Sequence, residues 1–257
     1  MKYSIIGSGL VGQALHRQLP NSIIYNRNES NALIEQPSDV VIVAAPTGNR
    51  ISVTEDPSKD LNDCQQIIKL LEQCKYNQVV YISTLDVYST RTSTDANPHL
   101  VYPVASYGRN RWLLEQAISA MPNSYITRLS SLSDRLMNKN ILYDLKAQIW
   151  LDKICLDSYI QWYPLNRLAT DIITSLDCGI KYQNLCSPPI CNRDIVQKFF
   201  PNLISQLNKN NVIPITYNVK NYDQGYAVPL DQIWQSFDEF FIDHSVKLVY
   251  NQHSKEI

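Results

Sequence analysis

The stretch "GSGLVG", residues 7–12, decides the fold that we expect for this chain. It holds three of the seven glycines among 257 residues, in the spacing G-x-G-x-x-G. The run "KYSII" (residues 2–6) before it predicts a strand, and "LVGQALHRQL" (residues 10–19) after it has apolar side chains at helical spacing. A glycine turn between a strand and a helix is typical of a dinucleotide-binding unit.

Each glycine of this turn has a separate physical reason. Gly7 allows the tight turn, Gly9 lets the backbone approach a pyrophosphate, and Gly12 lets the helix pack close to the strand. The N-terminus of the helix, with Leu10 and Val11, then faces the phosphates. The alternative is a glycine-rich turn that binds no ligand.

Strands and helices alternate along the first half of the chain. The continuous β-branched run "DVVIVAAP" (residues 39–46) is typical of a parallel strand buried on both faces. The alternation predicts an α/β fold with a Rossmann-type, doubly wound parallel sheet and a small C-terminal α/β substrate-binding lobe. The other expected strands are 22–26, 78–84 and 124–130, and the other expected helices are 61–74, 105–121, 190–203 and 229–244.

The same pattern indicates how the chain is divided. We expect residues 1–130 to form the dinucleotide-binding domain, with residues 150–180 returning to its sheet. Residues 131–257 then form most of the substrate-binding lobe, so that the two parts are interleaved.

The end of the second strand favours NADP over NAD. NAD-binding units usually place Asp or Glu there, to bind the ribose hydroxyls, whereas this chain has Asn26 followed by Arg27. No carboxylate repels a 2'-phosphate, and a guanidinium is present to bind it. The alternative is that Arg27 is a solvated turn residue. We also expect the end of the third strand to contact the cofactor, through Ala44, Ala45 and Pro46.

Composition excludes several classes of protein. A formal net charge of -1 argues against a nucleic-acid-binding protein, which normally carries a basic face. The sequence contains no run of ~18 apolar residues, so we expect no membrane span. The six cysteines form no C-x-x-C pair and no set with the four histidines at metal-ligand spacing, so we expect free thiols in a cytoplasmic protein and no metal site.

Two further stretches, "YISTLDVYS" (residues 81–89) and "YGRNR" (residues 107–111), resemble the extended branch of the short-chain dehydrogenase/reductase family. Its members are sugar-nucleotide epimerases, dehydratases and reductases, with a strand reading about S-[ST]-x-x-V-Y-G and a helix reading Y-G-x-S-K. By position, Thr84 matches the hydroxyl residue of this family and Tyr107, 23 residues later, matches its catalytic tyrosine.

The resemblance implies an NADP-dependent oxidoreductase or epimerase. Tyr107 would move a proton, Thr84 would orient the substrate oxygen, and a cation would stabilise the phenolate, because a phenol with pKa ~10 is otherwise a poor acid or base at neutral pH. The cation of this family is a lysine, and here it is Arg111, which keeps the charge but not the shape. No Asp-Glu pair follows Thr84, which fits a reductase better than a dehydratase.

The departures from the family pattern support a second hypothesis. Besides Arg111, Ser89 stands where relatives have the glycine of V-Y-G. The chain would then be a catalytically weakened protein of the same fold, which binds a dinucleotide and acts as a sensor or partner-binding protein.

Substrate contacts are assigned by the same resemblance. We expect a small-molecule substrate, a nucleotide sugar, to contact Asp86, Asn140, Gln161 and Tyr163, with the Asn140 amide against its diphosphate. Structural roles are the alternative for Asp86 and for the aromatic segment "QWYP" (residues 161–164). The resemblance also suggests a homodimer built on the helix that carries Tyr107.

Overall fold

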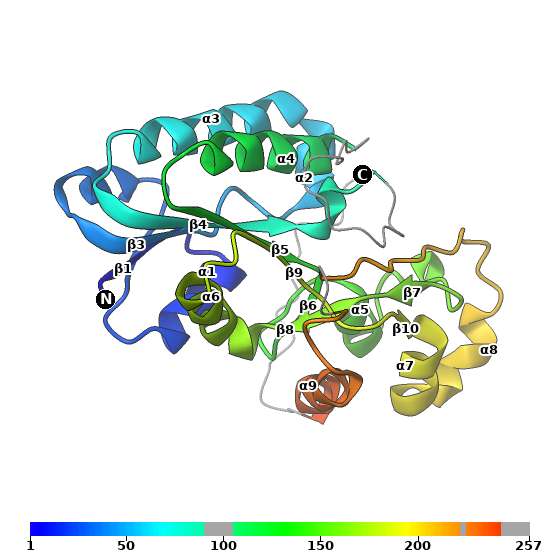
Figure 1. Cartoon of the computed structure of the whole chain (residues 1–257). Helices are drawn as coiled ribbons and strands as arrows, with labels where there is room; N and C mark the ends of the chain where they lie inside the picture. The colour runs from blue at the N-terminus through cyan, green and yellow to red at the C-terminus, as the bar shows by residue number, and fades with distance from the viewer. Residues whose placement is uncertain (90–104, 222–224, 243–257) are drawn as a thin grey trace.

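A parallel sheet forms the centre of the molecule. The computed structural model describes residues 1–89, 105–221 and 225–242. The sheet has six strands in the order β2-β1-β3-β4-β5-β9, and every neighbouring pair is parallel (Figure 1). Its strands are β1 (Tyr3–Ile6), β2 (Ile23–Tyr25), β3 (Ser38–Val43), β4 (Tyr76–Thr84), β5 (Ser124–Leu129) and β9 (Tyr182–Leu185). The α/β class and the parallel sheet that the sequence predicts are confirmed.

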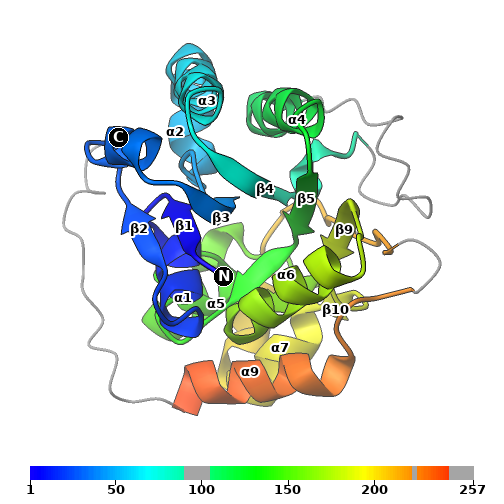
Figure 2. The same ribbon diagram turned by 60° about the vertical axis from the view of Figure 1, so that its left-hand side comes forward.

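Helices cover both faces of this sheet, as Figures 1 and 2 show. On one face lie α1 (Leu10–Gln18) and α6 (Leu168–Asp177), and on the other lie α2 (Arg50–Glu55), α3 (Pro57–Leu71) and α4 (Ser106–Ser119). Alternate strand residues serve the two faces: in β3, Val40 and Ile42 pack into the core with α1, whereas Val41 and Val43 pack into the core with α3. A strand with a continuous apolar run, such as residues 40–43 of β3, can bury both of its faces in this way.

The winding of the chain reverses between β1 and β3. From β1 the chain passes through α1 to β2, and from β3 it passes through α3 to β4 on the opposite face. In open parallel sheets, ligands bind beyond the carboxyl ends of the strands at such a switch point. The glycine turn follows β1 and therefore lies where this topology places a ligand.

The remaining described elements build a smaller α/β lobe. β6 pairs with β8 in parallel and β7 pairs with β10 in antiparallel orientation. In its core, the Trp162 ring meets the Phe237 ring edge-to-face, with centroids 5.1 Å apart. The elements of the lobe are β6 (Ser131–Ser133), α5 (Ile141–Ala147), β7 (Tyr159–Ile160), β8 (Trp162–Pro164), β10 (Ile190–Cys191), α7 (Asn192–Phe199), α8 (Ile204–Leu207) and α9 (Leu230–Ile242).

The two parts are interleaved along the chain. After β8 the chain forms η5 (Leu165–Arg167) and α6, adds β9 to the large sheet, and then returns to the lobe. Four further 3₁₀ turns connect described elements: η1 (Ser30–Glu35), η2 (Leu85–Val87), η4 (Leu151–Lys153) and η6 (Pro201–Leu203). None of the helices in the described ranges is long and apolar enough to cross a membrane.

The helix expected over 190–203 is wrong in its bounds. Residues 190–191 form strand β10, and α7 ends at Phe199. Phe200 has φ -140° and ψ 52°, outside the helical region, because a residue before a proline is restricted by the ring of Pro201.

Other boundaries follow from local capping. The helix expected over 61–74 begins earlier, at Pro57, because the Asp56 carboxylate accepts a hydrogen bond of 2.9 Å from the Lys59 N–H and caps the first turn. The helix expected over 229–244 is α9, and residues 243–244 lie outside the described ranges.

Candidate active site

The glycine turn at the switch point is tightly packed at two of its three glycines. Gly7 has φ +110°, and a Cβ there would lie 2.6 Å from the carbonyl oxygen of Ala44, at the end of β3. A Cβ on Gly12 would lie 1.8 Å from the carbonyl oxygen of Gly7. These two glycines therefore allow the backbone segments to approach each other as the sequence predicts.

Gly9 differs because nothing in the described structure lies within 4 Å of the Cβ it would carry. It is the N-cap residue of α1. Because glycine has no side chain, Gly9 makes no capping hydrogen bond to the first N–H groups of the helix, which include those of Leu10 and Val11. Open space in front of an uncapped helix N-terminus fits a pyrophosphate group. The residues present thus fit a dinucleotide cofactor.

The end of β3 forms the wall beside this turn. The Ala44 N–H donates to the Ile6 carbonyl at 2.8 Å, which holds the strand end against β1. Ala44, Ala45 and Pro46 are all half-buried. They lie at the switch point, in the region where the sequence analysis places a cofactor.

The two residues after β2 make contacts within the protein. The Asn26 side-chain oxygen accepts hydrogen bonds from the N–H groups of Asn28 and Glu29 and shapes the turn. The Arg27 guanidinium is 67% exposed and pairs with Asp63 of α3 at 2.6 Å. Because this pair is exposed to solvent, it contributes little to stability and leaves Arg27 free to exchange partners.

Thr84 and Asp86 lie at the carboxyl end of β4. The Thr84 hydroxyl oxygen accepts a hydrogen bond of 3.2 Å from the Asp86 N–H and caps η2. The Asp86 carboxylate accepts a hydrogen bond of 3.1 Å from the Tyr217 hydroxyl and forms an ion pair of 2.5 Å with Arg50. These residues, with Gln161 of the lobe, line a narrow crevice.

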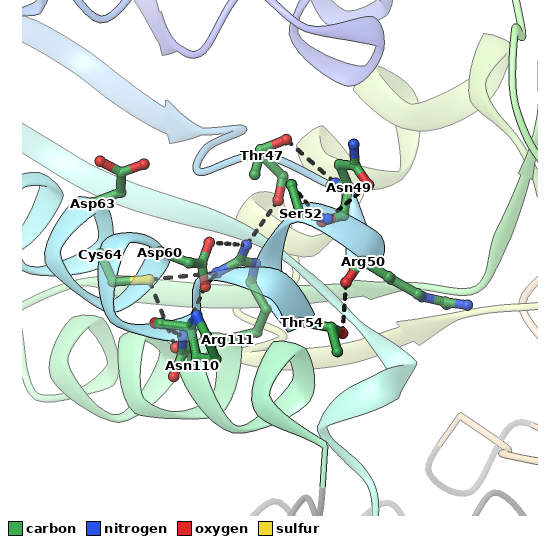
Figure 3. A network of polar contacts seen from close by, with 12 residues as sticks. Thr47, Asn49, Arg50, Ser52, Thr54, Asp60, Asp63, Cys64, Asn110 and Arg111 are labelled. Atoms are coloured by element: carbon green, nitrogen blue, oxygen red, sulfur yellow. Dashed lines mark hydrogen bonds and ion pairs between the residues drawn. The ribbon is translucent and has the colours of Figure 1, made fainter. Parts of the chain in front are cut away.

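Arg111 lies one helical turn after Tyr107 on α4, but its guanidinium is held by another residue. It forms two hydrogen bonds with the Asp60 carboxylate, of 2.7 and 3.0 Å, and donates a third, of 2.7 Å, to the Thr47 carbonyl (Figure 3). Both members of the pair are buried, with side chains 4% and 3% exposed. The Arg111 cation is therefore compensated by Asp60 and directed toward α3.

Tyr107 lies between two cations. The centroid of its ring is 4.7 Å from the guanidinium carbon of Arg111 and 5.9 Å from that of Arg50. Burial raises the pKa of the Tyr107 phenol above its ordinary value, and Asp86 acts in the same direction, whereas Arg111 and Arg50 oppose the shift. Burial prevails, so the phenol keeps its proton at neutral pH.

The other expected substrate residues have structural partners. The Asn140 side chain caps α5 by accepting from the Leu142 N–H at 3.0 Å, and it donates to the Leu132 carbonyl at 2.9 Å. The Tyr163 hydroxyl is buried and donates to Asp171 at 2.7 Å.

Gln161 joins the lobe to the crevice. Its amide nitrogen donates to the Ser187 and Val219 carbonyls, each at 2.8 Å, and its oxygen accepts from the Val219 N–H at 2.8 Å. The residue lines the crevice, but its polar atoms hold the segment that contains Val219 in place.

The sequence analysis did not single out Arg50, Asp60 or Tyr217. Arg50 follows the end of a predicted strand, and ligand-binding residues of parallel sheets often lie just beyond the carboxyl ends of the strands. Its position was therefore a signal in the sequence. Asp60 lies in the first turn of α3, where an acidic residue is ordinary. Tyr217 contacts Asp86 across 131 residues, and nothing in its local sequence indicates that contact.

No protein-family model matches the sequence, and no curated protein matches it with significance. Solved structures do match. RMD from Pseudomonas aeruginosa, complexed with NADPH, superposes with a TM-score of 0.67 at 12% identity, covering 94% of this chain and 99% of that chain. The chain has its fold.

Two further structures show the same architecture. The UDP-N-acetylglucosamine 4-epimerase from Bacillus cereus gives a TM-score of 0.66 at 17% identity, over 94% of this chain and 98% of that chain. The dTDP-4-dehydrorhamnose reductase from Bacillus anthracis, in complex with NADP, gives 0.65 at 16% identity, over 94% and 97%. The resemblance expected from the sequence motifs is confirmed at the level of the fold.

Proposed function

We propose that the chain is an NADP-dependent reductase or epimerase of the extended short-chain dehydrogenase/reductase family that acts on a nucleotide-activated sugar. The observation that supports this most directly is the space over Gly9, in front of the uncapped N-terminus of α1 at the switch point. The fold is also that of an NADPH-bound and an NADP-bound protein and of a UDP-sugar epimerase.

Tyr107 and Thr84 would act together on a substrate carbonyl in the reductive direction. A bound NADPH supplies hydride chemistry. In reduction of a carbonyl, its oxygen must gain a proton, and the Tyr107 phenol, which burial keeps protonated, would be the group that supplies it. The Thr84 hydroxyl, at the end of β4, would donate a hydrogen bond to the same oxygen and orient it.

Cofactor selection is assigned to Arg27. Its ion pair with Asp63 is exposed, so the guanidinium could leave Asp63 and bind a 2'-phosphate through charge-assisted hydrogen bonds. Asn26 adds no negative charge beside it. We further propose that the protein acts in the cytoplasm as a homodimer built on α4, on which Leu113 is 39% exposed.

Binding is tested by titrating the protein with NADPH and NADH and following protein fluorescence. We expect Gly9→Val to weaken NADPH binding at least about tenfold while the thermal unfolding temperature stays near that of the wild type, because the new side chain fills only the open space. Arg27→Ala should weaken binding of NADPH but not of NADH. Equal affinity of wild-type protein and Gly9→Val for NADPH would contradict the proposal.

Turnover is tested separately with NADPH and a panel of keto-sugar nucleotides, by the absorbance of the reduced nicotinamide. We expect oxidation of NADPH by the wild type and loss of about 100-fold or more in Tyr107→Phe, the range that one general acid contributes. Tyr88→Phe, at a tyrosine whose hydroxyl contacts Arg128 and Asn184, is the matched control.

One observation favours a second function. Because Asp60 compensates the Arg111 charge, the cation that the family uses to stabilise the phenolate is engaged elsewhere. A dinucleotide-binding sensor without catalysis would have this arrangement. Tight NADPH binding with no turnover across the panel would select this alternative.

A further inference from the structure

Two cations approach each other across the loop that follows β3. The Lys139 ammonium, immediately before Asn140 and α5, donates to the Gly48 carbonyl at 3.3 Å. Arg50, two residues after Gly48, begins α2. Its side chain extends away from the cluster of Asp60 and Arg111, as Figure 3 shows. Lys139 therefore connects the lobe with the carboxyl edge of the large sheet, beside the Thr84 crevice that Arg50 lines.

The charges at this place are not balanced. Arg50 pairs with Asp86, but Lys139 forms no ion pair with a carboxylate in the described part of the chain, and its polar contact there is a backbone carbonyl. Partial burial lowers the pKa of Lys139, and the neighbouring Arg50 charge lowers it further. Two cations and one carboxylate leave an excess positive charge, which an anion would compensate.

Neighbouring polar groups are already used within the protein. The Asn140 amide, which the resemblance assigns to a diphosphate, caps α5 and binds the Leu132 carbonyl. Among the described residues, the Lys139 ammonium donates to the Gly48 carbonyl, and its side chain is exposed at the surface. Its three N–H donors and its flexible stem suit a phosphate oxygen.

We propose that Lys139 and Arg50 form a site for a diphosphate group, with Lys139 contributed by the lobe and Arg50 by α2. The inference rests on the proposed function for the identity of the ligand. The pyrophosphate of the dinucleotide is already placed at the N-terminus of α1, so the diphosphate proposed for this site is that of the nucleotide sugar. Binding it at this place would join the lobe to the sheet through Lys139.

The test measures the affinities of NADPH and of UDP, a nucleoside diphosphate without the sugar, by calorimetry on the full chain. We expect Lys139→Gln to weaken UDP binding about tenfold, the loss of one charge-assisted hydrogen bond, and to leave NADPH binding unchanged, whereas Lys139→Arg should retain most of the affinity for UDP. Lys198→Gln is the matched control, because Lys198 lies on α7 and pairs with the exposed Asp238. Arg50→Gln should weaken the same ligand as Lys139→Gln.

The two arms separate the sources of the diphosphate. Weaker UDP binding with unchanged NADPH binding supports the site, whereas weaker NADPH binding with unchanged UDP binding would overturn it and assign Lys139 to the cofactor. If Lys139→Gln matches Lys198→Gln for both ligands, or if the wild type binds neither, the site does not exist. A wild type that binds UDP but not NADPH would refute the proposed cofactor while the UDP arm still tests the site.

Discussion

Arg111 and Asp60 form an ion pair whose two side chains are both removed from water. Taking two charges out of water costs free energy, and their attraction offsets it only when the geometry is good and the other polar atoms have partners. Here the carboxylate accepts two bonds from Arg111 and one of 2.9 Å from Asn110, and the guanidinium also binds the Thr47 carbonyl. The pair therefore holds α4 against α3 and the loop after β3.

Removing one member of this pair should cost far more than removing both. We expect Arg111→Met to lower the free energy of unfolding by about 3–5 kcal/mol, because it leaves the Asp60 carboxylate buried without its cation. The double variant Asp60→Asn with Arg111→Met should recover a large part of that loss. Urea denaturation of the single and double variants measures the coupling. Additive losses would show that the two side chains are energetically independent.

The buried cysteines give a prediction about pH. Burial raises the pKa of the Cys64 thiol from 9.0 to about 11 and that of the Cys186 thiol from 9.0 to about 12. Both thiols stay protonated and unreactive at neutral pH. Their contribution to stability is complete below pH 9 and falls as the pH rises through 11 and 12, because ionisation then favours the unfolded chain.

Alkylation checks this prediction. At pH 8, iodoacetamide should modify the exposed Cys178 well before Cys64 and Cys186, as read by mass spectrometry of the digested protein. Equal rates for the three thiols in the native protein would contradict it. Labelling in urea should remove the difference, since burial is its cause.

The ion-pair partner of Arg111 could not be predicted from the sequence. The spacing of Thr84 and Tyr107 and the glycine turn predict a site at the strand ends. Thr84 ends β4, and the Tyr107 ring lies near Arg50, which pairs with Asp86 just beyond that strand. The partner of Arg111 lies 51 residues away, on a helix whose sequence looks ordinary. Only the packing of α3 against α4 brings the two charges together.

The junction of β1 and α1 is the element on which the sheet and the candidate cofactor site both depend. Gly12 and Gly9 lie three residues apart yet differ in what surrounds them. A Cβ at Gly12 would overlap the Gly7 carbonyl, whereas a Cβ at Gly9 would meet nothing within 4 Å. Gly12 is thus required by packing, whereas Gly9 is the glycine that we propose for ligand binding.

This difference predicts opposite effects on stability. Gly12→Ala should destabilise the protein by about 1–3 kcal/mol, because the helix must move away from the strand. Gly9→Ala should change the free energy of unfolding by less than about 1 kcal/mol, because a loss of this size is typical of an N-cap change. Thermal and urea unfolding of the two variants measure both values. A Gly12→Ala protein as stable as the wild type would show that the turn is not close-packed.

Elements with strong periodicity were predictable, and short ones were not. The buried runs at β3 and β4 and the amphipathic pattern of α3 follow from local sequence. Helix α2 has six residues, too few for a helical period to be seen, and it carries Arg50. β9 has the mixed sequence "YQNL", and its pairing with β5, far away in the chain, determines its structure.

Over the entire fold, residues 211–221 connect the lobe with the strand ends of the large sheet. Tyr217 contacts Asp86, Val219 is held by Gln161, and the Asn184 amide donates to the Lys220 carbonyl at 2.9 Å. None of these contacts is local in sequence. The position of the segment therefore depends on how the two parts are arranged, and its Tyr217 lines the crevice.

Loss of the Gln161 contacts should loosen this segment without unfolding the sheet. We expect Gln161→Leu to speed amide hydrogen exchange in residues 217–221, while exchange in β1, β3 and β4 stays as slow as in the wild type. The reason is that a leucine of similar volume keeps the packing but leaves the Val219 groups without partners. Faster exchange throughout the sheet would show that the lobe and the sheet open as one unit.

The ion pair of Arg111 with Asp60 also has an evolutionary consequence. A chain that changes only one of these positions must pass through a state with an unpaired buried charge, which the fold tolerates poorly. The two positions should therefore covary. Among natural relatives, a neutral residue at the position of Asp60 should therefore occur together with a neutral residue at the position of Arg111, because a cation left there alone would be buried without its partner.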